Sequence, residues 1–218
     1  MIRFTDVIVF DLNGLLVDDE LIQLQATNEV LSAYGISLSE KTWIEECVGQ
    51  KPNEYLPRML AHMAHINIAQ IVREKDVIYY MRVSENIHNI MRHGALSLLE
   101  YARKSKKLLA LATSTTKSGA VAILDDKTLK INHYFELVIT GDDVTNAKPD
   151  PEIYNEIRRR LGVNLRYTAL EDSSPGINSA KAAGMACIAV PNRFTASQNF
   201  SQADIVITSL ARDAEILA

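Results

Sequence analysis

Cysteine is scarce in this chain, which has only Cys47 and Cys187 among its 218 residues, far apart and without a CxxC pair. That pattern favours a reducing compartment over a disulfide-stabilised scaffold. No apolar run approaches the roughly 18 residues that a membrane-spanning helix needs. The N-terminus also lacks the apolar segment followed by small residues that marks a secretory signal. We therefore expect a cytoplasmic protein that does not enter a membrane.

The chain also has no excess of positive charge, because its formal net charge is -4 at pH 7. This mild acidity gives no support for binding to nucleic acid or to an acidic membrane. With 47% hydrophobic and 23% charged residues, the composition is that of an ordinary globular protein. No internal repeat or low-complexity tract is visible. The length suits one large domain or a domain with an insert, and we expect a monomer.

A short apolar run at 7–10 (VIVF) predicts a strand that is buried on both faces. Gly14 marks the turn that follows it. Helical patterns come next, the first from the acidic residues at 18–20 to Gly35, then at 54–65 and at 68–90. Because no convincing strand interrupts residues 17–91, this part of the chain predicts a small helical bundle.

From Gly94 onward, predicted helices alternate with predicted strands. Apolar runs predict strands at 108–112, 137–139, 168–170, 187–190 and 205–207. Helices are expected at 95–105, 117–126, 151–161 and 175–183, with a further helix at the C-terminus. Such alternation predicts an α/β fold with a parallel sheet covered on both faces. The core domain would then comprise residues 1–16 and 92–218, and residues 17–91 would be an insertion after its first strand.

Polar side chains follow the predicted strands where each strand ends. Asp11 follows the first strand, Thr113 the second, and Glu171 and Asp172 the fourth, while Lys148 lies in the loop after the third. The carboxyl ends of parallel strands meet at one edge, where open α/β sheets bind their ligands. We therefore expect these side chains to converge on a single crevice.

The chemistry that needs this set of groups is phosphoryl transfer. Phosphate binds to hydroxyl groups, to free N–H groups at a helix start and to an ammonium group. Mg²⁺ prefers a few carboxylate oxygens together with water and phosphate. A carboxylate can also serve as the nucleophile and form an aspartyl-phosphate.

Four motifs in this order resemble those of the haloacid dehalogenase superfamily of phosphohydrolases. They are FDLNG at 10–14, LATS at 111–114, KPDP at 148–151 and LEDSSPG at 170–176. The chain is most similar to the β-phosphoglucomutase-like branch, and residues 17–91 match its helical cap. The resemblance covers essentially the whole chain and implies a Rossmann-like parallel sheet as the core.

The resemblance implies a role for each residue that matches a motif. Asp11 would be the nucleophile and a Mg²⁺ ligand, and Lys148 would neutralise charge between Asp11 and the phosphate. Thr113 and the N–H group of Ser114 would hold the phosphoryl group. The remaining implied Mg²⁺ ligands are Asp172, the backbone carbonyl of residue 13, and Glu171 as a ligand or as a partner of one. Gln50 and Lys51 fall on the substrate-specificity loop of the family.

Asn13 departs from the family pattern, because phosphatases of the family have an aspartate there that exchanges a proton with the leaving group. An amide can form hydrogen bonds but cannot exchange a proton near neutral pH. Three interpretations are open. The asparagine could be an introduced change that traps a complex, a natural feature of a slow or non-phosphatase member, or a sign that another group supplies the proton.

Most of these candidate site residues also have a simpler structural explanation. Lys148 could be an exposed lysine, residues 113–116 could only cap a helix, Glu171 could be structural, and Lys51 could lie in a solvated turn. The presence of all four motifs favours the functional interpretation. The expected function is therefore Mg²⁺-dependent hydrolysis of a small phosphorylated metabolite such as a sugar phosphate.

Other activities of the family are weighed against this function. A dehalogenase would lack the pair formed by Glu171 and Asp172, and a phosphonatase would need a cap lysine in a matching context, which Lys41, Lys51 and Lys75 lack. A mutase would carry His and Arg where this chain has Gln23 and Pro52. Mutase and phosphonatase remain alternatives, as does a silent pseudoenzyme that binds phosphometabolites.

Overall fold

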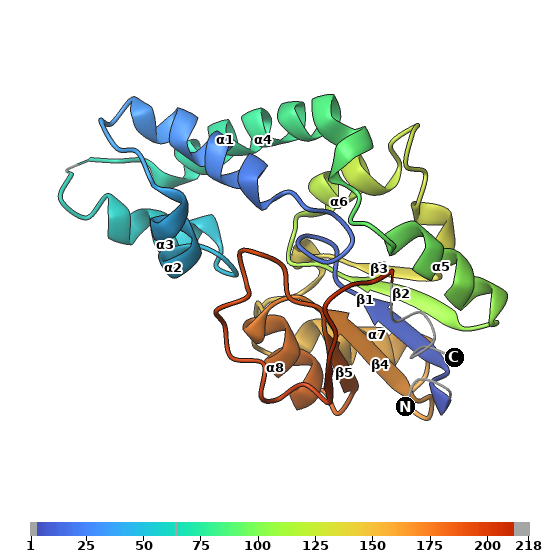
Figure 1. The fold of residues 1–218 in the computed structure, drawn as a ribbon. Coiled ribbons are helices and arrows are strands. Elements are labelled where there is room, and N and C mark those ends of the chain that lie inside the picture. Colours follow the sequence, from blue (N-terminus) through green and yellow to red (C-terminus); the bar gives the residue numbers. More distant parts are fainter. Residues whose placement is uncertain (1–3, 64, 212–218) are drawn as a thin grey trace. The chain divides into compact units, whose positions relative to one another are not determined.

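The computed structural model describes residues 4–63 and 65–211. The helix expected at the C-terminus involves residues 212–218, which lie outside the described residues. The chain divides into two compact units, both drawn in Figure 1. The core unit comprises Met1–Asp18 and Ile87–Ala218, and the helical unit comprises Asp19–Asn86.

In the described part of the core unit, the strands form one parallel sheet in the order β3-β2-β1-β4-β5-β6. They are β1 (Val7–Phe10), β2 (Leu108–Ala112), β3 (Leu137–Ile139), β4 (Tyr167–Glu171), β5 (Ala186–Ala189) and β6 (Ile205–Val206). Each lies within one residue of its expected bounds, and the Rossmann-like parallel sheet is confirmed. At the centre, Phe10 of β1 pairs with Leu111 of β2 and with Leu170 of β4.

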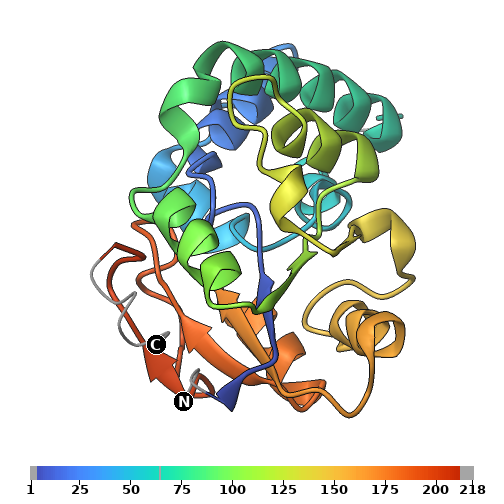
Figure 2. The same ribbon diagram turned by 90° about the vertical axis from the view of Figure 1, so that its right-hand side faces the viewer.

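Helices cover both faces of this sheet because successive strand residues point to opposite sides. The helices are α5 (Ala95–Lys104), α6 (Lys117–Leu124), α7 (Glu152–Leu161) and α8 (Ser174–Ala182), with short 3₁₀ turns η2 (Asn132–Tyr134) and η3 (Gly141–Asp143). Val9 packs in one buried cluster with Ile153 of α7 and Ile177 of α8. Phe10 faces the other way and meets Phe135 edge-on. Figure 2 shows α5 and α7 on opposite sides of the sheet.

The helical unit contains α1 (Glu20–Ser32), α2 (Glu40–Glu46), α3 (Pro52–Met59) and most of α4 (Ile68–Ile90). Aromatic side chains fill its interior, where Trp43 meets Tyr55 edge-on and donates a hydrogen bond to Glu20. The longest helix, α4, carries charged residues along its length. Within residues 4–63 and 65–211, no helix is both long and apolar enough to cross a membrane.

Two helices of this unit differ from the expectation. The seven-residue helix α2 was not expected, since it is too short for a clear periodic pattern; the side chain of Ser39 caps it by accepting the N–H group of Thr42. The helix expected at 54–65 is α3, which starts earlier at Pro52, a favoured first helical residue, and ends at Met59. The predicted end at residue 65 is therefore wrong.

The two chain segments that link the core unit to the helical unit lie side by side. Val17 and Met91 form an isolated antiparallel bridge. The N–H group of Asp18 donates to the carbonyl of Ile90 at 2.6 Å, and that of Arg92 donates to Leu16 at 2.9 Å. These hydrogen bonds join the loop after β1 to the segment after α4.

Candidate active site

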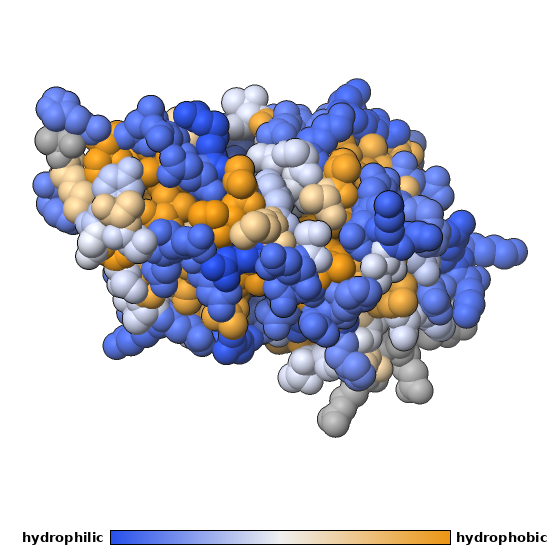
Figure 3. Space-filling view, turned by 90° about the horizontal axis from the view of Figure 1, so that it is seen from above, coloured by the Kyte–Doolittle hydropathy of each residue, from blue (hydrophilic) through white to orange (hydrophobic). Residues whose placement is uncertain are grey.

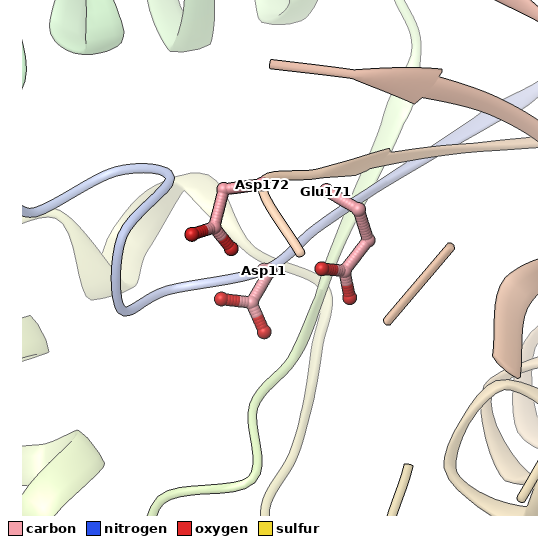
Figure 4. A group of neighbouring side chains, drawn as sticks. All are labelled: Asp11, Glu171 and Asp172. Atoms are coloured by element: carbon pink, nitrogen blue, oxygen red, sulfur yellow. The ribbon is translucent and has the colours of Figure 1, made fainter. Parts of the chain in front are cut away.

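The acidic side chains and the threonine expected at the strand ends come from three neighbouring strands. Asp11 follows β1, Thr113 follows β2, and Glu171 and Asp172 stand at the end of β4. Because β1 lies between β2 and β4, Asp11 sits between the threonine and the two acids. Figure 4 shows the carboxylates of Asp11, Glu171 and Asp172 gathered at this edge of the sheet.

Lys148, from the loop between β3 and α7, joins two of these carboxylates. Its ammonium group lies 2.6 Å from Asp11 Oδ1 and 2.6 Å from Glu171 Oε1, and it donates to the carbonyl of Ala112 at 2.9 Å. Burial by itself would lower the pKa of Lys148, but the two carboxylates raise it above its ordinary value. The lysine is therefore a fixed positive charge between two acids.

Glu171 is fully buried and closely packed. Its Oε1 also accepts a hydrogen bond from the hydroxyl of Tyr154 in α7. Burial and the nearby acids raise the pKa of Tyr154, so its phenol stays protonated and acts as a donor. A Cβ on Gly176 would lie 2.0 Å from Oε2, so only glycine fits there. Oε2 has no hydrogen-bond partner among the described residues.

Asp172 is held between two neighbours. Its Oδ2 accepts a hydrogen bond from the amide of Asn192 at 2.8 Å. On another side lies Gly14, whose φ is 79° and where an added Cβ would be 2.2 Å from the same oxygen. The glycine expected to mark a turn therefore also makes room for a carboxylate.

Asn13 accepts hydrogen bonds from two threonines. The hydroxyl of Thr115 donates to Asn13 Oδ1 at 2.6 Å, and that of Thr113 donates to it at 3.2 Å. The hydroxyl of Thr113 in turn accepts the N–H group of Thr115 at 3.1 Å, which leaves its own proton for Asn13. These contacts tie the loop after β1 to the loop after β2.

The donor set fits a hard divalent cation. Asp11, Glu171 and Asp172 are all buried, and each offers a carboxylate oxygen within 4.8 Å of the others. Lys148 contacts two of these carboxylates, those of Asp11 and Glu171, so the three carboxylates keep an excess of negative charge over this ammonium group. Oxygen ligands with such an excess suit Mg²⁺, and the buried Oε2 of Glu171 has no hydrogen-bond partner among the described residues that would compete with a cation.

The other expected site residues are Ser114, Gln50 and Lys51. Ser114 is exposed in the loop that also holds Thr113. Gln50 and Lys51 belong to the helical unit, in the turn between α2 and α3. Gln50 accepts a hydrogen bond from Arg58 at 2.7 Å, and the N–H group of Lys51 donates to Glu54.

Tyr154, Thr115 and Asn192 contact the site but were not expected from the sequence. Asn192 had a usable signal, since it follows β5 and the carboxyl ends of all parallel strands share one edge. Thr115 lies two residues beyond Thr113 in the same motif loop. Tyr154 had no such signal, because a tyrosine on an apolar helix face usually belongs to the core.

Comparison with known proteins gives the same family from both sequence and structure. The family model described as haloacid dehalogenase-like hydrolase matches residues 8–190. The phosphorylated carbohydrates phosphatase of Thermotoga maritima is 30% identical over 186 residues, which cover 83% of this chain and 82% of that protein. The protein CbbY of Cereibacter sphaeroides is 30% identical over 217 residues, covering 94% and 93%.

Among solved structures, CbbY from Rhodobacter sphaeroides superposes with a TM-score of 0.84 in a crystal that contains xylulose-1,5-bisphosphate. It is 30% identical to this chain, and the match covers 95% of this chain and 96% of that one. The β-phosphoglucomutase of Clostridium difficile superposes with a TM-score of 0.79 at 24% identity, which shows the shared fold.

Proposed function

Since this chain belongs to the haloacid dehalogenase-like hydrolase family, we propose that it hydrolyses a small phosphomonoester through a phosphoryl group carried on Asp11. The observation that supports this most directly is the position of Lys148, whose ammonium group contacts Asp11 at 2.6 Å inside a buried acidic cluster. A carboxylate can act as the nucleophile. The positive charge beside it reduces the repulsion between this carboxylate and an approaching dianionic phosphoryl group.

The first half-reaction needs a nucleophile, a charge partner and a leaving-group proton. A carboxylate oxygen of Asp11 attacks phosphorus, and the bond from phosphorus to the substrate oxygen breaks. Lys148 neutralises part of the charge, and Thr113 with the N–H group of Ser114 holds the phosphoryl oxygens. The departing alkoxide must take its proton from water, because the Asn13 amide has none to give near neutral pH.

In the second half-reaction, water attacks the phosphorus of the aspartyl-phosphate. Inorganic phosphate leaves, and the carboxylate of Asp11 is restored. Asn13 cannot remove a proton from that water, so we propose that both steps run slowly in this chain. General acid–base groups contribute roughly 10²–10⁴-fold to such reactions.

We propose Mg²⁺ as the cofactor, held by Asp11, Asp172 and the backbone carbonyl of Asn13, with Glu171 as a further ligand or as a partner of one. When bound, Mg²⁺ neutralises the carboxylates and polarises the phosphoryl group. The net negative charge of the cluster and the unpaired Glu171 oxygen support this assignment.

A sugar phosphate is the proposed substrate class. This rests on the relatives, one of which is named a phosphatase of phosphorylated carbohydrates and another of which was crystallised with xylulose-1,5-bisphosphate. Residues 17–91 would act as a cap that closes when substrate binds, with Gln50 and Lys51 contacting the part of the substrate away from the phosphate. Small-angle scattering with and without a phosphate analogue would detect such closure.

Asn13 supports one alternative function, the binding of phosphometabolites without turnover, because its amide cannot act as an acid or a base. A panel of metabolite phosphates separates the two when it is run on this chain and on Asn13→Asp, with Asp11→Ala as the inactive reference. Phosphate release from a sugar phosphate by Asn13→Asp supports the hydrolase. Binding of the same compound with no release by either protein supports the silent binder and contradicts the hydrolase.

A further inference from the structure

Asn192 reaches the site from a strand end to which the proposed function gives no role. It follows β5 by way of Val190 and Pro191. Its side-chain oxygen accepts the backbone N–H groups of Phe194 at 2.8 Å and of Thr195 at 3.1 Å. Because two N–H groups donate to this atom, it must be the oxygen of the amide and not the nitrogen. The NH₂ group therefore points away from this turn.

That NH₂ group has two acceptors for its two protons. One is Asp172 Oδ2 at 2.8 Å, and the other is the carbonyl oxygen of Gly14 at 3.2 Å. The backbone of Gly14 comes so close that an added Cβ would lie 2.2 Å from Asp172 Oδ2 and 2.9 Å from Asn192 Nδ2. Oδ2 of Asp172 therefore accepts a hydrogen bond from the Asn192 amide and lies close to the backbone of Gly14, where a side chain would not fit.

Arg92 brings a positive charge to the loops that hold Gly14 and Asn192. Its guanidinium donates to three backbone carbonyls, those of Gly14 at 2.6 Å, Val190 at 3.1 Å and Pro191 at 3.3 Å. Burial lowers the pKa of Arg92, while the negative charges of Asp172 and Asp18 act in the opposite direction. A cavity of about 440 Å³ opens beside Arg92 and Asn192.

We propose that Asn192 is a positioning residue for Asp172, and that its hydrogen bond to Oδ2 keeps the other carboxylate oxygen turned toward Asp11. This inference rests on the metal site of the proposed function. An amide suits the task because it donates a hydrogen bond without bringing a charge that would compete with the metal. Partners of this kind behind a metal ligand change metal affinity by roughly 10–100-fold.

The sharpest test is Asn192→Asp, which keeps the shape of the side chain. Its carboxylate still accepts the N–H groups of Phe194 and Thr195, but it presents an acceptor to Asp172 where the amide presented a donor. Metal-free full-length protein is titrated with Mn²⁺, free Mn²⁺ is followed by electron paramagnetic resonance, and Mg²⁺ is added as the competitor. We expect Mn²⁺ affinity to fall roughly 10–100-fold in Asn192→Asp and in Asn192→Ala.

Thr195→Val is the matched control. The hydroxyl of Thr195 accepts the backbone N–H group of Asn192 at 3.0 Å. Loss of this hydroxyl weakens the same turn but leaves the side-chain amide that faces Asp172 unchanged. Thermal unfolding of the metal-free proteins verifies that each variant is folded. We expect wild-type Mn²⁺ affinity in this control, and an equal loss in Thr195→Val and Asn192→Asp would overturn the positioning role.

Two other outcomes separate this inference from the proposed function. If the unmodified chain binds Mn²⁺ and Asn192→Asp binds it equally well, the inference is wrong and the metal site stands. If the unmodified chain binds neither Mn²⁺ nor Mg²⁺, both the metal site and the role of Asn192 are wrong.

Discussion

Lys148 lies 2.6 Å from Asp11, although 137 residues separate the two in the chain. The contact joins the loop before α7 to the end of β1, and the same ammonium group also meets Glu171. Both side chains of the Lys148–Asp11 pair are nearly inaccessible to water, with exposures of 7% and 10%. A buried pair of this kind is costly to break from one side, because the remaining acid keeps its charge without compensation.

Removal of this lysine should destabilise the fold in a way that a divalent cation partly reverses. We expect Lys148→Met to lower the free energy of unfolding by about 3–5 kcal/mol in the presence of EDTA. Mg²⁺ at 100 times its dissociation constant should restore about 2.7 kcal/mol. Urea unfolding with EDTA and with MgCl₂ measures both effects.

Lys181→Met is the matched control for this experiment. Lys181 pairs with Asp204 at 2.7 Å, but both side chains are more than a quarter exposed. Surface pairs contribute about 0–1 kcal/mol. The acidic cluster is intact in Lys181→Met, so Mg²⁺ should raise its free energy of unfolding by the same amount as that of the unmodified chain. Equal urea midpoints for the two variants in EDTA would show that the Lys148 pair is not a structural requirement.

Gly14→Ala should impair metal binding more than backbone strain alone explains. The new Cβ would lie 2.2 Å from Asp172 Oδ2, and the left-handed backbone there costs a further 1–3 kcal/mol or so. Gly35 has a similar φ of 69° with nothing within 4 Å of its Cβ position. Calorimetric Mg²⁺ titration should therefore show a loss of affinity for Gly14→Ala and none for Gly35→Ala. Unchanged affinity in Gly14→Ala would exclude Asp172 from the metal site.

Asn13→Asp should convert a slow enzyme into an active phosphatase. The rest of the site is in place, so we expect kcat to rise by roughly 10²-fold or more while KM changes far less. The losses at the two half-reactions do not multiply, because only the slower step limits turnover. Steady-state phosphate release from the best substrate of the panel provides both constants. A rise in KM without a rise in kcat would contradict the acid–base explanation.

Thr115 should matter once an acid stands at position 13. Its hydroxyl lies 2.6 Å from the side-chain oxygen of Asn13 and would donate to a carboxylate in the same place. Hydrogen bonds to charged groups contribute about 1.5–3 kcal/mol, so Thr115→Val in the Asn13→Asp background should lower kcat roughly tenfold or more. Thr115→Ser keeps the hydroxyl and should retain most of the activity. Equal kcat for the Val and Ser variants would remove this contact from the mechanism.

The sequence was informative where one strong physical signal decided the local structure. Apolar runs such as 7–10 and 108–112 predict buried strands, and the order of strands and helices predicts the parallel sheet. The short helix α2 was missed because its stability depends on tertiary contacts, above all the burial of Trp43. The end of α3 was misplaced because the helical sequence pattern continues past Met59, whereas the helix itself ends there.

The site shows the same division between local and long-range information. Strand-end polarity indicated Asp11, Thr113 and the acids of β4, which the structure brings together. The partners that fix them, such as Tyr154 on Glu171 and Asn192 on Asp172, are distant in sequence and depend on how helices and loops pack. No periodicity in the sequence encodes such contacts.

The most direct test of the central claim is to look for phosphate on Asp11. The unmodified chain is mixed with excess p-nitrophenyl phosphate, whose leaving group needs little acid assistance, and the reaction is quenched over time. We expect a burst of about one p-nitrophenolate per chain, a slow phase after it, and a phosphoryl group that peptide mass spectrometry places on Asp11. Asp11→Ala should show neither the burst nor the modified peptide. The absence of phosphate on Asp11 in both the unmodified chain and Asn13→Asp, or its presence on a different residue, would contradict the account.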